Sequence, residues 1–443
     1  MKQILLLGAG KSSGALIQYL LEKSKPFDFT LKIGDIDLPQ TIKKINGHPN
    51  GSAFAFNVND KDQRAEEIQK ADLVLSLLPP ALHFPVAQDC LRFSKNLITA
   101  SYVSPELLAL NDEVKSKGLL FLNECGLDPG LDHMSAMEII LKLKKKGASI
   151  QSFQSYTGGL IAPESIDNPW GYKFTWNPRN VILAGQGTAK YIKDNKYHYL
   201  PYNRLFKESI RIKVEGKGSY DGYANRDSLS YRHHYGLQDI PTMIRGTLRH
   251  EGFCSAWQVF VSLGLTDDTY KIENSDKLSY REFVESFIPP SQRGDTTEEK
   301  IAKFCEIDFE GPAMERVIST GILEEKNIGL KNASPAQILQ QLLEVKWQLK
   351  EGDKDMIVML HQFDYLEDGI EKRLSSSLLI KGEDTIQTAM AKTVGLPLGI
   401  AAVNMLQGNF KIKGVQLPIH EEIFVPVLME LKEYGISFDE KIV

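Results

Sequence analysis

Two short polar stretches, residues 99–104 and 123–133, follow apolar segments and hold the side chains best able to do chemistry. Ser101 and Tyr102 lie in the first stretch, and Asp128 lies in the second. Asp128 precedes a proline, which favours an extended backbone and keeps Asp128 out of the helix that follows. Ligands of an open parallel sheet bind at the carboxyl ends of its strands, so both stretches are predicted to border a ligand site.

A glycine-rich loop follows the first apolar segment. Its three glycines have the spacing GxGxxxG, a variant of the dinucleotide-binding fingerprint. The first permits a tight turn, the second lets backbone amides approach a pyrophosphate, and the third lets helix and strand pack closely. An ATPase-type phosphate loop would need a glycine where Leu5 stands, so that alternative is rejected. The loop residues predicted to bind a dinucleotide are Gly8, Gly10, Lys11, Ser12, Ser13 and Gly14.

Asp35 stands 21 residues after Gly14, where the fingerprint has an acidic residue. A carboxylate there accepts hydrogen bonds from the adenosine ribose and repels a 2′-phosphate, so Asp35 argues for NAD over NADP. The alternative is an aspartate in a solvated turn. At the ends of later strands, Asn57 and Val58 are expected near the adenine, and Leu78 under the pyrophosphate or the nicotinamide ribose.

Three arginines, Arg226, Arg245 and Arg249, lie in strand-like segments of a slightly acidic chain. The planar guanidinium group binds a carboxylate through two parallel hydrogen bonds. Arg245 and Arg249 are an even number of residues apart, so in a strand both would face one side. The set is predicted to bind an anionic substrate, and the alternative is a surface strand with solvated charges.

Several segments, in order along the chain, resemble those of the glutamate-forming saccharopine dehydrogenases, also called saccharopine reductases. The resemblance spans nearly the whole chain, and GLDPGLDH together with RGTLR is far more specific than the glycine loop. The matching segments are residues 8–14, 100–102 (ASY), 126–133 (GLDPGLDH), 168–176 (NPWGYKFTW), 225–228 (NRDS), 244–249 (IRGTLR) and 389–397 (AMAKTVGLP).

The resemblance implies the oxidation of a secondary amine in lysine metabolism. A hydride would pass from the lysine ε-carbon of saccharopine to a nicotinamide, and water would hydrolyse the imine to glutamate and 2-aminoadipate 6-semialdehyde, or the reverse. By analogy with the family, the cofactor contacts would be Ala100, Ser101, Leu127, Asp128, Pro129 and Thr175. The substrate contacts would be Ser101, Tyr102, Asp128, Arg226, Thr247, Leu248 and Arg249.

Tyr102 and Asp128 are the predicted catalytic acid–base groups, because this chemistry needs proton transfers near neutrality and both lie on strand-end loops. His133 suits the role by type, but its place in a first helical turn equally suits a packed or capping residue. Cys125 is interpreted as a small buried residue, since no covalent intermediate is required. The adjacent histidines at 233–234 lack further ligands at metal spacing, so no metal is predicted.

One departure from the family concerns the cofactor. Fungal-type members have a basic residue after the second strand that suits NADP, whereas this chain has Asp35, Ile36 and Asp37 there. NAD is therefore the predicted cofactor, with NADP as the alternative. Two other functions stay open: a carboxynorspermidine-type dehydrogenase of polyamine synthesis, and a catalytically silent scaffold that binds a nucleotide. The arginine set favours the more highly charged saccharopine.

Positioning these residues requires a suitable scaffold, and the first 125 residues alternate short apolar runs with amphipathic stretches. Such alternation predicts an α/β fold with a doubly wound, Rossmann-type parallel sheet and helices on both faces. The predicted strands are residues 4–7, 30–33, 53–56, 73–77, 97–99 and 119–122, and the predicted helices are residues 12–23, 60–70, 82–93 and 104–116.

The pattern changes after residue 131, where an α+β substrate-binding and dimerisation domain is expected. Its predicted strands are residues 150–156, 209–215, 242–249, 355–363 and 373–381; the predicted helices are residues 131–146, 254–263, 279–287, 312–322, 334–346, 386–405 and 421–435. The expected domains are residues 1–130 and 131–389, and the family resemblance implies that the segment from about 390 to 443 completes the nucleotide-binding domain.

The 443 residues are 42% hydrophobic and 25% charged, which is typical of two folded domains. A net charge of −5 gives the whole chain no nucleic-acid footprint. Four cysteines without a CxxC indicate reduced thiols and a cytoplasmic enzyme. The apolar start is too short for a membrane helix and lacks a cleavage site, so neither a membrane segment nor a signal peptide is expected. A homodimer with a small-molecule substrate is the expected assembly.

Overall fold

The computed structural model describes residues 1–442, which form two compact units. Unit 1 comprises Met1–Ser149 and Ile380–Asp439, and unit 2 comprises Ile150–Leu379 with the last residues of the chain. Helix α7 (Leu131–Lys145) packs on α17 (Glu421–Glu433) and therefore belongs to unit 1, which differs from the limit expected at residue 130.

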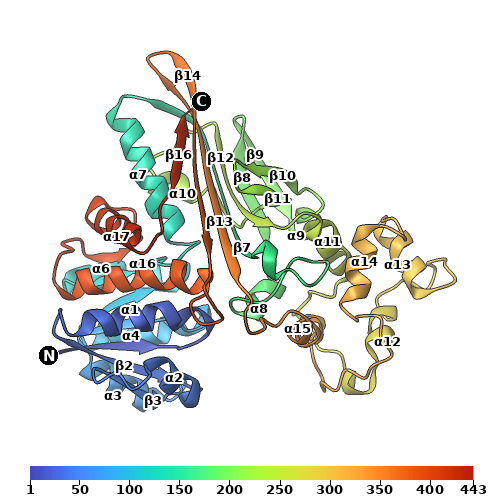
Figure 1. Cartoon of the computed structure of the whole chain (residues 1–443), viewed down its shortest axis with the longest axis horizontal. Helices are drawn as coiled ribbons and strands as arrows, with labels where there is room; N and C mark the ends of the chain where they lie inside the picture. Colours follow the sequence, from blue (N-terminus) through green and yellow to red (C-terminus); the bar gives the residue numbers. More distant parts are fainter. Residues whose placement is uncertain (443) are drawn as a thin grey trace. The chain divides into compact units, whose positions relative to one another are not determined.

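Unit 1 is built on a seven-stranded sheet in which every strand pair is parallel, with the order β15-β6-β5-β4-β1-β2-β3. Figure 1 labels β2 and β3 of this sheet, which lie in the blue N-terminal part of the chain. Chain order reverses between β1 and β4, and ligands of such sheets bind at that reversal. The α/β class with a doubly wound sheet is thus confirmed. The strands are β1 (Lys2–Leu7), β2 (Phe29–Asp35), β3 (Gly51–Ala55), β4 (Leu73–Ser76), β5 (Asn96–Thr99), β6 (Leu120–Leu122) and β15 (Gly414–Gln416).

The C-terminal segment adds strand β15 and helix α16 (Ala389–Leu406) to this unit. Helix α16 packs closely on α1 (Gly14–Ser24), because a Cβ at Gly395 would lie only 2.8 Å from Leu16 N. By length and composition α16 could cross a membrane, but 83% of it is buried inside the protein, as expected of a core helix. The other helices are α2 (Leu38–Ile45), α3 (Lys61–Lys70), α4 (His83–Arg92), α5 (Pro105–Leu108) and α6 (Asn111–Ser116).

Unit 2 contains a nine-stranded sheet with the path β10-β11-β12-β7-β13-β14-β16, and β8 pairs with β12 and β9. The β8–β9 hairpin and β11 were not predicted. The hairpin turns at Asp194 and Asn195, which both have positive φ, and such a pair is a known hairpin signal. The strands are β7 (Ser149–Ile161), β8 (Thr188–Lys193), β9 (Lys196–Pro201), β10 (Ile210–Val214), β11 (Gly218–Ala224), β12 (Thr242–Arg249), β13 (Asp355–Glu367), β14 (Ile370–Lys381) and β16 (Asp439–Ile442).

An aromatic core holds the helices of unit 2 against one face of its sheet. The Trp170 ring lies 5.3 Å from Trp347, 5.4 Å from Phe253 and 6.1 Å from Trp257, measured between centroids. Trp170 belongs to the NPWGYKFTW motif, so that motif supplies core as well as polar residues. The helices are α8 (Pro178–Ile182), α9 (Tyr202–Leu205), α10 (Tyr231–His234), α11 (Phe253–Leu263), α12 (Tyr280–Glu285), α13 (Thr297–Cys305), α14 (Pro312–Ser319) and α15 (Pro335–Lys346).

Candidate active site

The glycine loop of unit 1 connects β1 to α1 and has the geometry of a dinucleotide cradle. Gly8 has φ of +97°, and a Cβ there would lie 3.0 Å from the Leu77 backbone. A Cβ at Gly14 would lie 2.6 Å from Ile386 O, so this glycine permits the close packing of helix α1. Gly10 is exposed, and no atom lies within 4 Å of its Cβ position. The loop is therefore tight at its ends and open at its middle, which fits a bound pyrophosphate.

Two side chains of opposite charge brace this loop. The Asp35 carboxylate accepts hydrogen bonds from Ala9 N at 2.5 Å and from Asp37 N at 2.8 Å. The Lys44 ammonium donates to Ala9 O at 2.5 Å, to Gly10 O at 2.6 Å and to Ser13 Oγ at 3.0 Å.

Lys44 extends from helix α2, which was not predicted, and its role was therefore missed. Burial lowers the pKa of Lys44, and Asp35 and Asp37 act in the opposite direction. The signals for the helix were the N-cap carboxylate of Asp37, which accepts a hydrogen bond from Gln40 N, and a proline in the first turn.

The other predicted cofactor residues of unit 1 differ in exposure. The Asn57 side chain is exposed and accepts a hydrogen bond from Asn59 N, whereas Val58 is buried in the core beside the sheet. Leu78 is half-buried after β4. Of the rest, Lys11 is exposed, Ser12 and Ala100 are half-buried, and Ser13, Leu127 and Pro129 are buried.

The two predicted acid–base residues are hydrogen-bonded to each other. Tyr102 OH donates to Asp128 Oδ1 at 3.2 Å, and both side chains are half-buried. Asp128 lies in a tight turn in which Gly126 N donates to Pro129 O at 3.0 Å and Leu131 N donates to Gly126 O at 2.8 Å. The structure thus brings together residues that lie 26 positions apart in the sequence.

A buried polar cluster supports this turn. His133 Nε2 lies 2.9 Å from Glu124 Oε2, and Val103 N donates to Glu124 Oε1 at 3.1 Å, so one carboxylate joins two strand-end loops. The His133 and Glu124 side chains are both almost completely buried, which suits a packed role for His133. Cys125 is fully buried, and its burial raises the pKa of the thiol.

His83 is a second residue at the candidate site that was not predicted from the sequence. Its Nδ1 lies 2.9 Å from Ser76 Oγ and its Nε2 lies 2.8 Å from Ser101 Oγ, so it joins the ends of strands β4 and β5. His83 begins helix α4, seven residues after the end of β4, and the sequence alone does not indicate its contact with Ser101.

In unit 2, Arg249 is a buried cation surrounded by aromatic rings. It is only 4% exposed, and its guanidinium lies 5.1 Å from the Tyr172 ring and 5.2 Å from the Phe253 ring. Its Nη2 donates weakly to Tyr223 OH at 3.4 Å. Within residues 1–442, Arg249 has no carboxylate partner, and its Nε has no hydrogen-bond partner.

Two further buried polar atoms near Arg249 have no partner among the described residues, namely Tyr172 OH and Thr157 Oγ1. Thr157 of β7 is in register with Thr247 of β12, and Thr247 is two positions from Arg249. Buried polar groups are almost always paired, so three orphaned atoms in one place indicate a polar ligand. Thr157 was not predicted as a site residue.

Successive side chains of β12 point to opposite faces of the sheet, so the remaining predicted substrate residues on this strand do not all lie on the face of Arg249. Leu248 is packed in an apolar cluster with Ile244 on the opposite face from Thr247, so its side chain lies away from Arg249. Arg245 is buried, with its guanidinium 4.2 Å from the Tyr231 ring.

Two other predicted residues of unit 2 lie outside β12. Arg226 was expected in a strand, but it is exposed, lies in the loop after β11 and has φ of +49°. Thr175 is buried.

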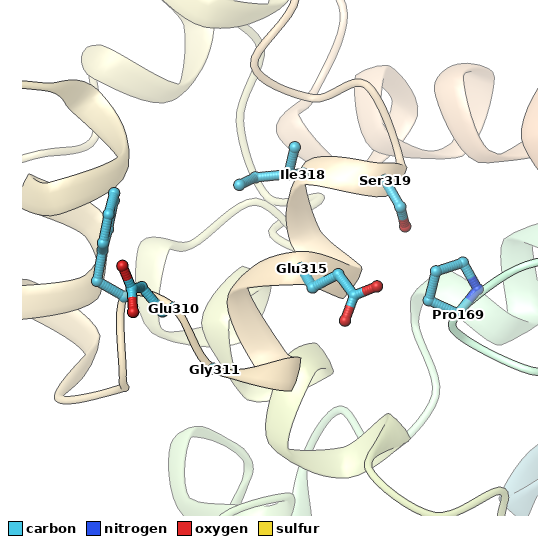
Figure 2. Close-up of a pocket in the computed structure, with 7 residues that line it drawn as sticks. Pro169, Glu310, Gly311, Glu315, Ile318 and Ser319 are labelled. Atoms are coloured by element: carbon cyan, nitrogen blue, oxygen red, sulfur yellow. The ribbon is translucent and has the colours of Figure 1, made fainter.

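Unit 2 contains a hollow of about 400 Å³ that has a different set of lining residues. Figure 2 shows Glu310, Glu315, Ile318 and Ser319 around it, and Pro169, Phe309 and Gly311 complete its lining. None of the predicted site residues lines it. Both of its ionisable residues are acidic, which is the wrong sign for a substrate with carboxylates.

Comparison with known proteins identifies relatives over the full length of the chain. Models of the saccharopine dehydrogenase NADP binding domain and C-terminal domain match residues 4–122 and 126–436. The NADP(+)-dependent, L-glutamate-forming saccharopine dehydrogenase of Pyricularia oryzae is 31% identical, over all of this chain and 99% of that protein. The apo saccharopine dehydrogenase (L-Glu forming) structure from Saccharomyces cerevisiae superimposes with a TM-score of 0.87 and 30% identity, covering both chains completely.

The mitochondrial alpha-aminoadipic semialdehyde synthase of Bos taurus is 34% identical over 99% of this chain, which spans only 47% of that protein. The chain therefore spans about half the length of the mammalian relatives. The matched domain and the fungal names favour NADP over the NAD predicted from Asp35. The matches to both domains and to full-length relatives confirm the predicted resemblance: this chain belongs to the saccharopine dehydrogenase family.

Proposed function

We propose that this chain oxidises saccharopine with NADP and hydrolyses the product to L-glutamate and 2-aminoadipate 6-semialdehyde, or runs the reverse condensation. The observation that carries the proposal is the buried Arg249 guanidinium, which has no carboxylate partner in residues 1–442 and lies beside two other unpaired polar groups. A substrate carboxylate would pair with that cation. The names of the fungal relatives support the choice of substrate.

The glycine loop, Ser101 and the turn around Asp128 are the residues of unit 1 that we propose to hold the cofactor. A bound nicotinamide would supply the acceptor for a hydride from the substrate carbon. The Asp128 carboxylate is proposed to take the proton from the protonated secondary amine of the substrate, because the nitrogen lone pair must be free before the adjacent carbon can lose a hydride. Tyr102, which donates a hydrogen bond to Asp128, is proposed to orient that carboxylate and to exchange the proton with water during hydrolysis.

NADP is the proposed cofactor because Lys44 adds a cation to the loop. Its ammonium contacts Ala9 O and Gly10 O, in the same loop whose Ala9 N donates to Asp35. From there it is proposed to attract the 2′-phosphate on the adenosine ribose of NADP. Asp35 is proposed to act mainly as a brace, since its carboxylate already accepts two backbone hydrogen bonds. We propose that Lys44 serves the purpose of the basic residue that the family resemblance leads one to expect after the second strand.

A cytoplasmic homodimer acting on a small molecule is the proposed setting. All four cysteines are free thiols, and Cys90, Cys125 and Cys254 are buried, as suits a reducing compartment.

The deciding experiment follows the absorbance of reduced nicotinamide with saccharopine and either NADP or NAD. Turnover with NADP supports the whole proposal. Turnover only with NAD keeps the reaction and rejects the role of Lys44. Without turnover, carboxynorspermidine is the next substrate to test. Failure of both substrates, with nucleotide binding intact, would leave the silent scaffold.

A further inference from the structure

His83 is the one histidine of unit 1 that lies between two serine hydroxyls at the carboxyl end of the sheet. Ser76 is the last residue of β4, and Ser101 is the second residue after β5. The two distances, 2.9 Å to Nδ1 and 2.8 Å to Nε2, are those of direct hydrogen bonds. Ser76 and His83 are 0% and 3% exposed, so bulk water does not reach either side chain.

The imidazole is neutral at physiological pH, since burial lowers the pKa of His83 to about 4. A neutral imidazole has one N–H donor and one nitrogen acceptor, so its two serine partners must behave differently. One serine donates its hydroxyl hydrogen to the ring, and the other accepts the ring hydrogen. Which nitrogen carries the hydrogen therefore decides what Ser101 can offer to a ligand.

The buried serine decides between the two arrangements. Ser76 Oγ contacts no partner except His83 Nδ1 within the described chain, residues 1–442. If Nδ1 carried the hydrogen, the Ser76 hydroxyl hydrogen would be buried without an acceptor, which is costly. Ser76 therefore donates to Nδ1, and the ring hydrogen on Nε2 is donated to Ser101 Oγ.

We propose that His83 is a positioning residue that fixes Ser101 as a hydrogen-bond donor to an oxygen acceptor of the bound ligand. With Oγ accepting from Nε2–H, the Ser101 hydroxyl hydrogen is directed away from His83. Ser101 is half-buried and adjoins Tyr102, so its hydrogen meets a ligand at the carboxyl end of the sheet. The acceptor is a carboxylate oxygen of the substrate or the carboxamide oxygen of the cofactor. Only the identity of this acceptor rests on the proposed function.

The ring state is tested directly, without any substrate. Nitrogen-15 labelling of the histidines and long-range proton–nitrogen spectra distinguish the two neutral tautomers from the cation, and His83→Gln identifies the signal among nine histidines. We expect a neutral ring with the hydrogen on Nε2 throughout the neutral pH range. A ring with the hydrogen on Nδ1, or a charged ring, would overturn the inference even if the enzyme is active.

Substitutions then test the consequence for binding. The side-chain amide of His83→Gln can still donate to Ser101, so we expect saccharopine KM and cofactor Kd within about threefold of the parent. In His83→Leu the donor is lost, and one of these constants should rise by about tenfold. Equal effects of both variants would reject the donor assignment. Ser76→Ala removes the partner of Nδ1 and should produce a tautomer mixture, whereas the buried Ser24→Ala should not alter the His83 signal.

Ser101→Ala distinguishes the two acceptors. Weaker binding of the reduced cofactor, measured by its fluorescence without substrate, would assign the contact to the carboxamide. Unchanged cofactor binding with a higher KM for saccharopine would assign it to the substrate carboxylate. If neither constant changes, Ser101 donates to no ligand and the proposal fails.

Discussion

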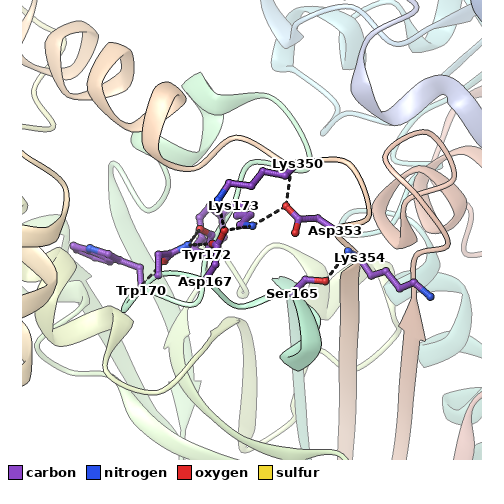
Figure 3. A network of polar contacts seen from close by, with 9 residues as sticks. Ser165, Asp167, Trp170, Tyr172, Lys173, Lys350, Asp353 and Lys354 are labelled. Carbon is purple, nitrogen blue, oxygen red and sulfur yellow. Dashed lines mark hydrogen bonds and ion pairs between the residues drawn. The ribbon is translucent and has the colours of Figure 1, made fainter.

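Two of the buried cations in unit 2, Lys173 and Arg249, have opposite surroundings. Lys173 is 1% exposed, and its ammonium lies 2.6 Å from Asp353 and 2.9 Å from Asp167. Figure 3 shows the resulting network, in which Lys350 also pairs with Asp167. Arg249 is 4% exposed and is surrounded by aromatic rings in place of carboxylates.

The difference separates a structural charge from a binding charge. Burying a charge is costly unless a partner compensates it, and the protein supplies that partner for Lys173. For Arg249, rings compensate only in part, since a cation–π contact is weaker than a buried ion pair. A fold keeps such an unpaired guanidinium at a cost in stability, which is understandable where a ligand carboxylate completes the pair.

The largest expected effect is the loss of stability on removing Lys173, the cation that is paired with carboxylates. Lys173→Met would leave Asp353 and Asp167 without their buried partner, which should lower the free energy of unfolding by about 3–5 kcal/mol. Urea unfolding measures this loss. Lys350→Met is the matched control, because this lysine contacts the same Asp167 but its side chain is 71% exposed. Similar losses in the two variants would contradict a structural role for Lys173.

Substitution of Arg249, the cation without a carboxylate partner, should affect substrate binding and leave stability nearly unchanged. Arg249→Ala should raise the KM for saccharopine by about 10- to 100-fold, since a charged hydrogen bond to a buried group contributes about 1.5–3 kcal/mol. Arg249→Met fills more of the space and should leave the free energy of unfolding nearly unchanged or higher. Steady-state kinetics and urea unfolding measure both effects.

Arg211→Ala is the control on the same sheet, because Arg211 is 43% exposed and already paired with Glu251 at 2.7 Å. If Arg249→Met destabilised the fold as much as Lys173→Met does, and KM stayed constant, the contrast between the two cations would be lost.

Lys44 is an intermediate case, a half-buried cation whose partners are neutral oxygens. Lys44→Met should weaken NADP binding by about fivefold, as expected for a contribution near 1 kcal/mol from a partly exposed charge. Asp35→Ala should weaken NAD more than NADP, because the carboxylate is the group suited to ribose hydroxyls. Titration of each cofactor against intrinsic fluorescence gives both ratios, and an unchanged ratio in either variant would remove that residue from cofactor selection.

The parts of this fold that the sequence predicts are those in which one local rule dominates. Strands β1 to β6 are short apolar runs with helices between them. The glycine loop has the spacing GxGxxxG directly after the first strand, which predicts a dinucleotide-binding loop. Helix α2 was missed because it is only eight residues long, although Leu38, Ile42 and Ile45 have helical spacing and Asp37 marks its start. Because helix α2 was not predicted, Lys44 was not recognised beside the glycine loop, and the prediction of NAD rested on Asp35 alone.

The site residues that the sequence could not predict depend on contacts between distant segments. Thr157 is significant only because β7 pairs with β12 in a register that places it beside Thr247. His83 is significant only because Ser76 ends β4 and Ser101 follows the end of the adjacent strand β5. Leu248 and Arg226 were predicted as substrate residues because they belong to family motifs. In the structure Leu248 lies on the opposite face of β12 from Arg249, and Arg226 lies in a loop.

The smallest expected effect is the acid sensitivity of the paired cation's network. The hydrogen bond from Lys350, together with Lys173, lowers the pKa of Asp167 from 3.8 to about 2. Since the folded-state pKa lies below the unfolded value, the stabilisation is complete above the unfolded pKa and is lost as the pH falls through the folded one. Asp167 is 37% exposed, so solvent screening should keep this contribution below about 1 kcal/mol. Asp167→Asn should therefore flatten the loss of stability between pH 3.8 and about 2, while Arg249→Met should leave that slope intact.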